Sequence, residues 1–130
     1  MHADMMANLD IFAAPKGRLL LANYDRQTVG CICMKELTTD IGEIKLMYVR
    51  PEFRGKGIGK ALITGILYEA RMIGYDGLRL DSTKFMHAAH HLYRSLGFAE
   101  IEPYSQSEIP EENQQYWVFM ELKISRLQDA

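Results

Sequence analysis

The chain has 130 residues, of which 48% are hydrophobic and 25% charged, which suits a single domain with a sizeable core. Its net charge of −2 argues against a general nucleic-acid binder, and no apolar run approaches the length needed to span a membrane. No apolar signal core is visible at the N-terminus, so we expect a cytoplasmic protein without nucleic-acid or membrane partners.

The first half of the chain predicts three strands joined by short turns. Residues 1–17 show weak periodicity, could include a short helix around residues 9–12, and end in a turn at Pro15-Lys16-Gly17. The strands are predicted at residues 18–24, 28–37 and 43–49. Connections this short favour an antiparallel meander.

Cys31 and Cys33 lie two residues apart in the second predicted strand and therefore share a face. Such a pair is a poor disulfide, and two further ligands for zinc are missing. We interpret both as buried thiols in a reducing compartment and expect no metal site.

The second half predicts two helices and three more strands. A helical pattern begins at Ile58 and ends near Gly74, and a second covers residues 87–96. Gly97 supplies a left-handed cap, and Phe98 is its hydrophobic partner. Strands are expected at residues 77–81, 99–104 and 115–124. This order predicts one α/β (α+β) domain over residues 1–130, with a core at 18–124 built on a mixed, mostly antiparallel sheet flanked by helices.

Between the third strand and the first helix lies a loop with glycine at alternate positions. Gly55, Gly57 and Gly59 can adopt positive φ and leave backbone N–H groups bare at a helix N-terminus. Basic residues between and beside them add positive charge; these are Arg54, Lys56 and Lys60. The loop therefore predicts an anion-binding turn.

Spacing excludes two familiar phosphate-binding loops. The dinucleotide motif needs G-x-G-x-x-G, whereas the glycines here form G-x-G-x-G. A P-loop needs a hydroxyl residue after its lysine, but Ala61 follows Lys60. The pattern that does fit is [QR]-x-x-G-x-[GA], met by Arg54, Gly57 and Gly59.

With this loop, and with the V-x-P-x-[FY] sequence that begins at Val49, the chain resembles the GNAT superfamily of N-acetyltransferases. Residues 89–98 add a second signature, A-x-x-L-Y-x-x-x-G-F. Leu80-Asp81 and Pro103-Tyr104 also look like a small bacterial subgroup of the family. The resemblance covers about residues 17–124.

The resemblance implies an N-acetyltransferase that uses acetyl-CoA as cosubstrate, without a metal, and acts on a primary amine of a small molecule or peptide. It implies direct attack of the amine, with Glu43 as general base and Tyr93 as general acid toward the coenzyme sulfur. Backbone groups of Met47 and Val49 would pair with the pantetheine arm, and Met47 N–H would hold the oxyanion. The implied coenzyme-binding residues are Met47, Tyr48, Val49, Arg54, Gly55, Lys56, Gly57, Ile58, Gly59 and Lys60.

Strict alternation along residues 43–49 predicts that Glu43, Lys45, Met47 and Val49 share one face of the strand. Ile44 and its alternate neighbours, Leu46 and Tyr48, would lie on the other.

Some positions depart from the family pattern. Met86 stands where many relatives have an asparagine that contacts the coenzyme arm. His87 and His91 of the second helix are spaced for one helix face, but no Glu follows His87 as in H-E-x-x-H and no third metal ligand is evident. The histidines of this helix (His87, His90 and His91) therefore predict a solvated face. His87, close to the helix start, could alternatively face the coenzyme phosphates.

The segment before the first predicted strand is shorter than the family pattern. Residues 1–17 would replace a strand and one or two helices, so a second subunit could complete the acceptor pocket as a homodimer, or the pocket could be open. This shortening also motivates an alternative function, a non-catalytic acyl-CoA-binding or regulatory module. The acidic loop at residues 104–114 favours a cationic acceptor, although it also suits an ordinary solvated loop.

Overall fold

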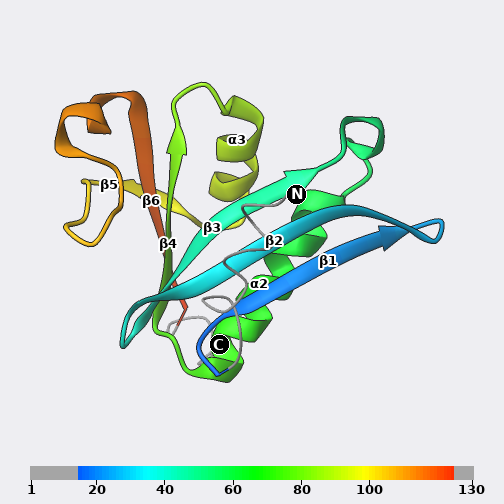
Figure 1. Ribbon diagram of the computed structural model, residues 1–130, viewed down its shortest axis with the longest axis horizontal. Coiled ribbons are helices and arrows are strands. Elements are labelled where there is room, and N and C mark those ends of the chain that lie inside the picture. Colours follow the sequence, from blue (N-terminus) through cyan, green and yellow to red (C-terminus); the bar gives the residue numbers. More distant parts are fainter. Residues whose placement is uncertain (1–14, 125–130) are drawn as a thin grey trace.

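A computed structural model describes residues 15–124 of the chain, and the predictions for residues 1–14 lie outside this range. One six-stranded sheet forms the centre, with strand order β1-β2-β3-β4-β6-β5 (Figure 1). Its strands are β1 (Arg18–Tyr24), β2 (Gln27–Thr38), β3 (Ile41–Val49), β4 (Gly77–Thr83), β5 (Ala99–Ile101) and β6 (Trp117–Lys123). All neighbouring strands are antiparallel except β3 and β4, so the predicted mixed, mostly antiparallel sheet is confirmed.

Two α-helices pack on the sheet, α2 (Ile58–Ile73) and α3 (His87–Ser95). Helix α2 ends at Gly74, which has φ 102° and donates its N–H to Ala70 and Arg71 carbonyls. Helix α3 ends as predicted: Gly97 has φ 108°, and Phe98 N–H reaches back to the Tyr93 carbonyl at 3.0 Å. Both predicted helices and their glycine stops are confirmed.

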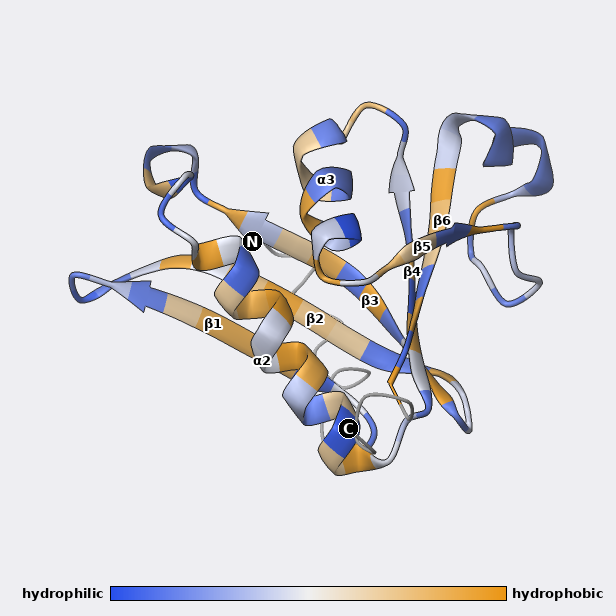
Figure 2. Cartoon of the chain, turned by 180° about the vertical axis from the view of Figure 1, so that it is seen from behind, coloured by the Kyte–Doolittle hydropathy of each residue, from blue (hydrophilic) through white to orange (hydrophobic). Residues whose placement is uncertain are grey.

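Two short 3-10 helices complete the described chain, η2 (Pro51–Phe53) and η3 (Glu111–Tyr116). Strand β5 is shorter than predicted, because the chain leaves the sheet after Ile101 and Tyr104 turns inward. The β5–β6 connection that follows is hydrophilic along most of its length (Figure 2).

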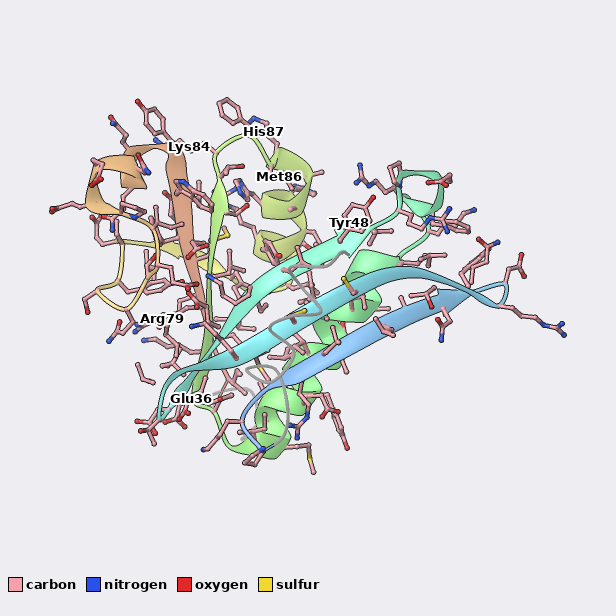
Figure 3. The ribbon with its side chains drawn as sticks, in the orientation of Figure 1. Glu36, Tyr48, Arg79, Lys84, Met86 and His87 are labelled. Carbon is pink, nitrogen blue, oxygen red and sulfur yellow. The ribbon has the colours of Figure 1, made fainter. Side chains whose placement is uncertain are left out.

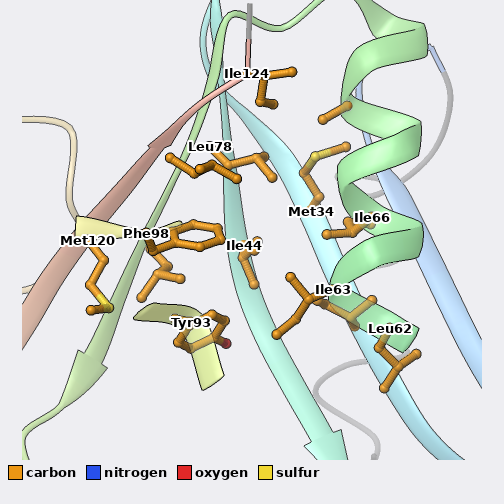
Figure 4. Packing of buried hydrophobic residues seen from close by; sticks show 14 of the residues in the cluster. Met34, Ile44, Leu62, Ile63, Ile66, Leu78, Tyr93, Phe98, Met120 and Ile124 are labelled. Atoms are coloured by element: carbon orange, nitrogen blue, oxygen red, sulfur yellow. The ribbon is translucent and has the colours of Figure 1, made fainter. Parts of the chain in front are cut away.

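The core lies between α2 and the sheet (Figure 4). Helix α2 buries one stripe, spaced three or four residues apart as an amphipathic helix requires; it consists of Leu62, Ile63, Ile66 and Ala70. Opposite it, β2, β3 and β4 contribute apolar side chains, among them Ile32, Met34, Ile44, Leu78 and Leu80. This packing fixes the position of β3 relative to α2, and with it the loop that joins them.

The sheet opens between its two parallel strands. Strands β3 and β4 pair only from Ile41 with Gly77 to Ile44 with Leu80, although β3 continues to Val49 and β4 to Thr83. Beyond this point they diverge, with α3 beside the opening (Figure 1). We call the point of divergence the fork.

Candidate active site

A cavity of about 520 Å³ lies between the end of β3, the glycine loop and the start of α3. Of the ten residues expected to bind coenzyme, only Lys56 does not line it. Tyr48, Met86 and His87 lie on the two sides of the opening in Figure 3. The cavity also has lining residues that the sequence analysis did not assign to coenzyme binding: Phe53, Phe85, Ala88, Ala89 and Leu92.

The glycine loop needs its glycines for two different reasons. Gly55 and Gly57 have φ of 79° and 82°, a left-handed conformation that L side chains rarely adopt. An added Cβ at either would meet nothing within 4 Å, so their role is conformational. At Gly59 a Cβ would lie 3.1 Å from Leu92 Cδ2, so glycine there lets α2 approach α3 closely.

The side chains of Arg54 and Lys56 interact with other residues of the chain. Arg54 Nε donates to the Val49 carbonyl at 3.0 Å, and its guanidinium lies 5.9 Å from the centre of the Tyr48 ring. Lys56 Nζ lies 5.6 Å from the Tyr24 ring, away from the cavity lining. Lys60 lines the cavity within the first turn of α2.

The backbone of β3 faces the fork at Met47 and Val49. Arg50 N–H donates to the Val29 carbonyl at 2.8 Å. With the register of β2 and β3, this bond identifies which facing residues of the two strands are hydrogen-bonded to each other. Because these pairs alternate in an antiparallel ladder, the N–H and C=O groups of Met47 and Val49 point away from β2. They point toward the side on which β4 has diverged.

A β-bulge interrupts the strict alternation of side chains that was predicted along β3. Cys33 pairs with Leu46 and Met34 with Ile44, so Lys45 has no partner on β2. Ile44 therefore belongs to the core facing α2, where Met47 and Val49 also pack. The prediction that these two share a face with Glu43 and Lys45 is wrong, because the extra residue reverses the pattern.

Glu43 lies on the opposite face from α2, paired with Lys35 across β2–β3, and its side chain is 0% exposed. The Tyr104 hydroxyl donates to Glu43 Oε2 at 2.7 Å. Glu43 Oε1 lies 3.8 Å from Lys35 Nζ and 3.7 Å from Lys45 Nζ, and it has no hydrogen-bond partner among the described residues. Burial raises the pKa of Glu43, against the lowering effects of the Tyr104 hydrogen bond and of the two lysines.

Lys45 links three carboxylates at the fork. Its Nζ lies 2.9 Å from Glu108 and 3.9 Å from Asp81, in addition to Glu43. Asp81 follows Leu80, the last residue of β4 that pairs with β3, so this ion pair spans the first position where the backbones have separated. Burial also raises the pKa of Asp81, and its carboxylate accepts a hydrogen bond from Ser107 Oγ at 3.3 Å.

Tyr93 is buried on the inner side of α3, 5% exposed, with its ring 5.4 Å from that of Phe98 (Figure 4). Burial raises the pKa of Tyr93 to about 12. Ala89 and Leu92, which precede Tyr93 on the same helix, line the cavity, whereas Tyr93 and Glu43 do not.

The histidines of α3 are not uniformly solvated, which corrects the prediction. His90 is buried, its Nε2 lies 3.0 Å from Ser82 Oγ, and burial lowers its pKa. His87 lines the cavity, and His91 is exposed. Over residues 15–124 there is no group of three or more His, Cys, Asp or Glu placed to hold a metal, and no helix long and apolar enough to cross a membrane.

A second cavity of about 480 Å³ lies on the face of the sheet opposite α2. It is lined by β2 and the end of β3, including Cys31, Leu46 and Tyr48. Cys31 and Cys33 are both buried on this face and are not disulfide-bonded, as predicted. Tyr48, near the end of β3, lines both cavities.

None of the five residues that surround Glu43 was predicted as a site residue from the sequence; they are Lys35, Lys45, Asp81, Tyr104 and Glu108. Tyr104 and Glu108 come from the loop after β5, more than sixty residues from Glu43 and Lys45 along the chain. The Pro103-Tyr104 pair matched the subgroup pattern, which was the available signal, but nothing in the spacing joined it to Glu43.

Comparison with known proteins defines the class. The profile of the acetyltransferase (GNAT) domain matches residues 15–100. An N-acetyltransferase of Schizosaccharomyces pombe, itself uncharacterised, is 32% identical over 126 residues, which cover 95% of this chain and 74% of that protein. This chain therefore belongs to the GNAT acetyltransferase family, whose chemistry is acetyl transfer from acetyl-CoA.

Solved structures share the fold. An acetyltransferase from Streptococcus agalactiae superposes with a TM-score of 0.79 at 19% identity, covering 92% of this chain and 74% of that one. A GNAT family acetyltransferase from Elizabethkingia anophelis with acetyl-CoA bound gives a TM-score of 0.68 at 23% identity, covering 81% and 74%.

Proposed function

We propose that this protein transfers the acetyl group of acetyl-CoA to a primary amine of a small molecule or peptide. The amine attacks the thioester directly, so no acyl-enzyme is formed, and Cys31 and Cys33 need not act as nucleophiles. The observation that carries the proposal is the single cavity that joins the glycine loop to the backbone of β3 beside the fork.

The donor half of the reaction would use backbone groups. The bare N–H groups around Gly55 and Gly57, at the N-terminus of the 16-residue helix α2, suit a diphosphate. The N–H and C=O groups of Met47 and Val49 suit an amide-containing arm that adds beside β3 like another strand. Met47 N–H would then stabilise the oxyanion of the tetrahedral intermediate.

The acid–base half would use two buried side chains. A protonated amine must lose a proton before it attacks, and Glu43 Oε1 is the carboxylate atom that has no hydrogen-bond partner among the described residues, so we propose that it accepts this proton, directly or through water. The raised pKa of Glu43 strengthens it as a base. Tyr93 is protonated at neutral pH and can donate to the departing thiolate.

The acceptor would approach from the face of the sheet that carries Glu43, opposite α2. The second cavity lies on that face and shares one lining residue, Tyr48, with the donor cavity. Within residues 15–124, strands β1 and β5 form the edges of the sheet, and we propose that a second copy of the chain pairs there and completes the acceptor pocket. Light scattering distinguishes a homodimer from a monomer.

The test is release of free thiol from acetyl-CoA in the presence of a panel of primary amines. We expect at least one amine to give turnover that depends on both substrates, with a mass increase of one acetyl group on the amine. Tighter binding of ATP or NAD than of coenzyme A would contradict the proposal.

The alternative, an acyl-CoA-binding module without catalysis, has one observation in its favour. Neither Glu43 nor Tyr93 lines the donor cavity. Calorimetry that shows acetyl-CoA binding, together with no turnover across the amine panel, would support this alternative over the enzyme.

A further inference from the structure

Tyr104 makes a buried contact with the proposed base that connects distant parts of the chain. Its hydroxyl donates to Glu43 Oε2 at 2.7 Å, and the two residues are 8% and 0% exposed. Tyr104 lies in the loop after β5, whereas Glu43 lies on β3. The contact therefore exists only when the loop is folded onto the sheet.

Neighbouring side chains hold the Tyr104 ring in place. Phe119 of β6 meets it edge-on, with ring centres 5.5 Å apart at 85°. Arg79 of β4 covers the ring with its guanidinium 5.4 Å from the centre, and Arg79 is itself tied to Glu121 by a 2.8 Å hydrogen bond. Figure 3 shows Arg79 on the part of β4 that precedes the opening. The direction of the hydroxyl is thus set by two strands.

Charged groups reach the Glu43 carboxyl from three strands. Lys35 of β2 and Lys45 of β3 lie 3.8 and 3.7 Å from Oε1, and Asp81 of β4 acts on it through its charge. Glu108 reaches the cluster through Lys45. The lysines are too distant from Oε1 for hydrogen bonds. Tyr104 is accordingly the group that fixes the orientation of the carboxyl.

We infer that Tyr104 is a positioning residue for the base: it occupies Glu43 Oε2 and leaves Oε1 to accept the proton from the acceptor amine. This inference rests on the proposed role of Glu43. Burial and the nearby Glu43 raise the pKa of Tyr104, so the hydroxyl stays protonated and remains a donor wherever the enzyme works. A donated hydrogen bond stabilises the charged carboxylate, and it therefore lowers the pKa of Glu43 against the effect of burial.

The Tyr104→Phe variant tests this with the ring retained. Activity should rise with pH as Glu43 loses its proton, and without the hydroxyl the pKa of Glu43 rises, so this limb of the kcat/KM profile moves to higher pH. We expect a loss of about tenfold or more on the acidic side, with recovery toward the wild-type rate above the new limb. Tyr116→Phe, at an exposed tyrosine, is the matched control and should not move the limb. An unchanged limb in Tyr104→Phe would overturn the inference.

A double-mutant cycle tests the same contact without catalysis. The free energy of unfolding is measured for wild type, Tyr104→Phe, Glu43→Gln and the double variant. Coupling between the two single changes supports the inference, and additive effects refute it. The proposed function fails separately, if Glu43→Gln keeps the wild-type rate at every pH. Titration of the Glu43 carboxyl by NMR needs no substrate, so it tests the contact with Tyr104 independently of the proposed function. A Glu43 pKa that is unchanged in Tyr104→Phe would also refute the inference.

Discussion

The donor cavity and the Glu43 cluster are built in opposite ways. Most residues that line the cavity come from one continuous stretch, from Met47 to Lys60, and we propose that the backbone N–H and C=O groups of this stretch bind the coenzyme. The cluster is assembled from side chains of β2, β3, β4 and the loop after β5, and its central carboxyl is fully buried. A backbone site depends on local conformation, whereas a side-chain cluster depends on the whole fold.

This difference has a functional consequence. Substitutions in the cluster should change the rate while coenzyme still binds, and substitutions in the loop should change binding while the acid–base groups stay intact. A variant that changes both properties would contradict this division. The four predictions that follow are ordered from the largest expected effect to the smallest.

Glu43→Gln should have the largest effect. It keeps the shape of the side chain but removes the base, and general-base catalysis typically contributes about 10²–10⁴-fold to the rate. We expect kcat/KM to fall by that order while coenzyme A affinity, measured by calorimetry, stays within about twofold of wild type. Glu111→Gln, at an exposed position on η3, is the control. A loss of coenzyme binding equal to the loss of rate would show that the two regions are not separable.

Tyr93→Phe should reduce the rate by about tenfold to a hundredfold, less than Glu43→Gln because a thiolate leaves readily without full protonation. The ring and its packing on Phe98 remain, so the melting temperature should hold. The measurement is steady-state thiol release. A wild-type rate in this variant would remove Tyr93 from the mechanism.

Gly57→Ala should weaken coenzyme A binding by about tenfold. Space is available for the methyl group, but an L residue at φ 82° costs roughly 1–2 kcal/mol and shifts the loop N–H groups. Gly74→Ala imposes a similar conformational cost at φ 102° at the other end of α2. It should lower stability without changing affinity. Equal affinity losses in both variants would mean that the effect is global rather than local.

Lys60→Ala and Lys56→Ala should have the smallest effects on coenzyme binding, and comparing them tests the geometry of the loop. Lys60 lines the cavity, while Lys56 turns toward Tyr24. A single exposed charge facing a phosphate contributes up to about 1 kcal/mol, so Lys60→Ala should weaken coenzyme binding by about three- to fivefold. The loss in Lys56→Ala should be smaller, and the reverse order would contradict the described loop geometry.

The sequence predicted the contiguous parts of the molecule well. The boundaries of α2, its stop at Gly74 and the cap at Gly97 follow from side-chain spacing and glycine conformation, which act within a few residues. The anion cradle is local in the same sense. Residues 43–49 are a different case, because the bulge at Lys45 arises from the pairing register with β2. The adjacent apolar residues Leu46-Met47 were the only local trace of it.

The contacts of Tyr104 and His90 could not be predicted from the sequence. Tyr104 was predicted at the end of a strand, but the strand stops at Ile101 and the Tyr104 ring packs against Phe119. His90 was predicted to be solvated because its helix neighbours are polar, but its side chain faces Ser82 of β4. Both depend on which elements meet in three dimensions, and hydrophobic periodicity carries no information on that.

The most direct test of the account is a crystal structure with coenzyme A. We expect the diphosphate to lie within hydrogen-bond distance of the N–H groups around Gly55–Lys60, and the pantetheine arm to pair with Met47 and Val49. The sulfur should lie at the fork beside the Tyr93 hydroxyl. A coenzyme that leaves the fork empty, or whose sulfur lies far from both Tyr93 and Glu43, would contradict it.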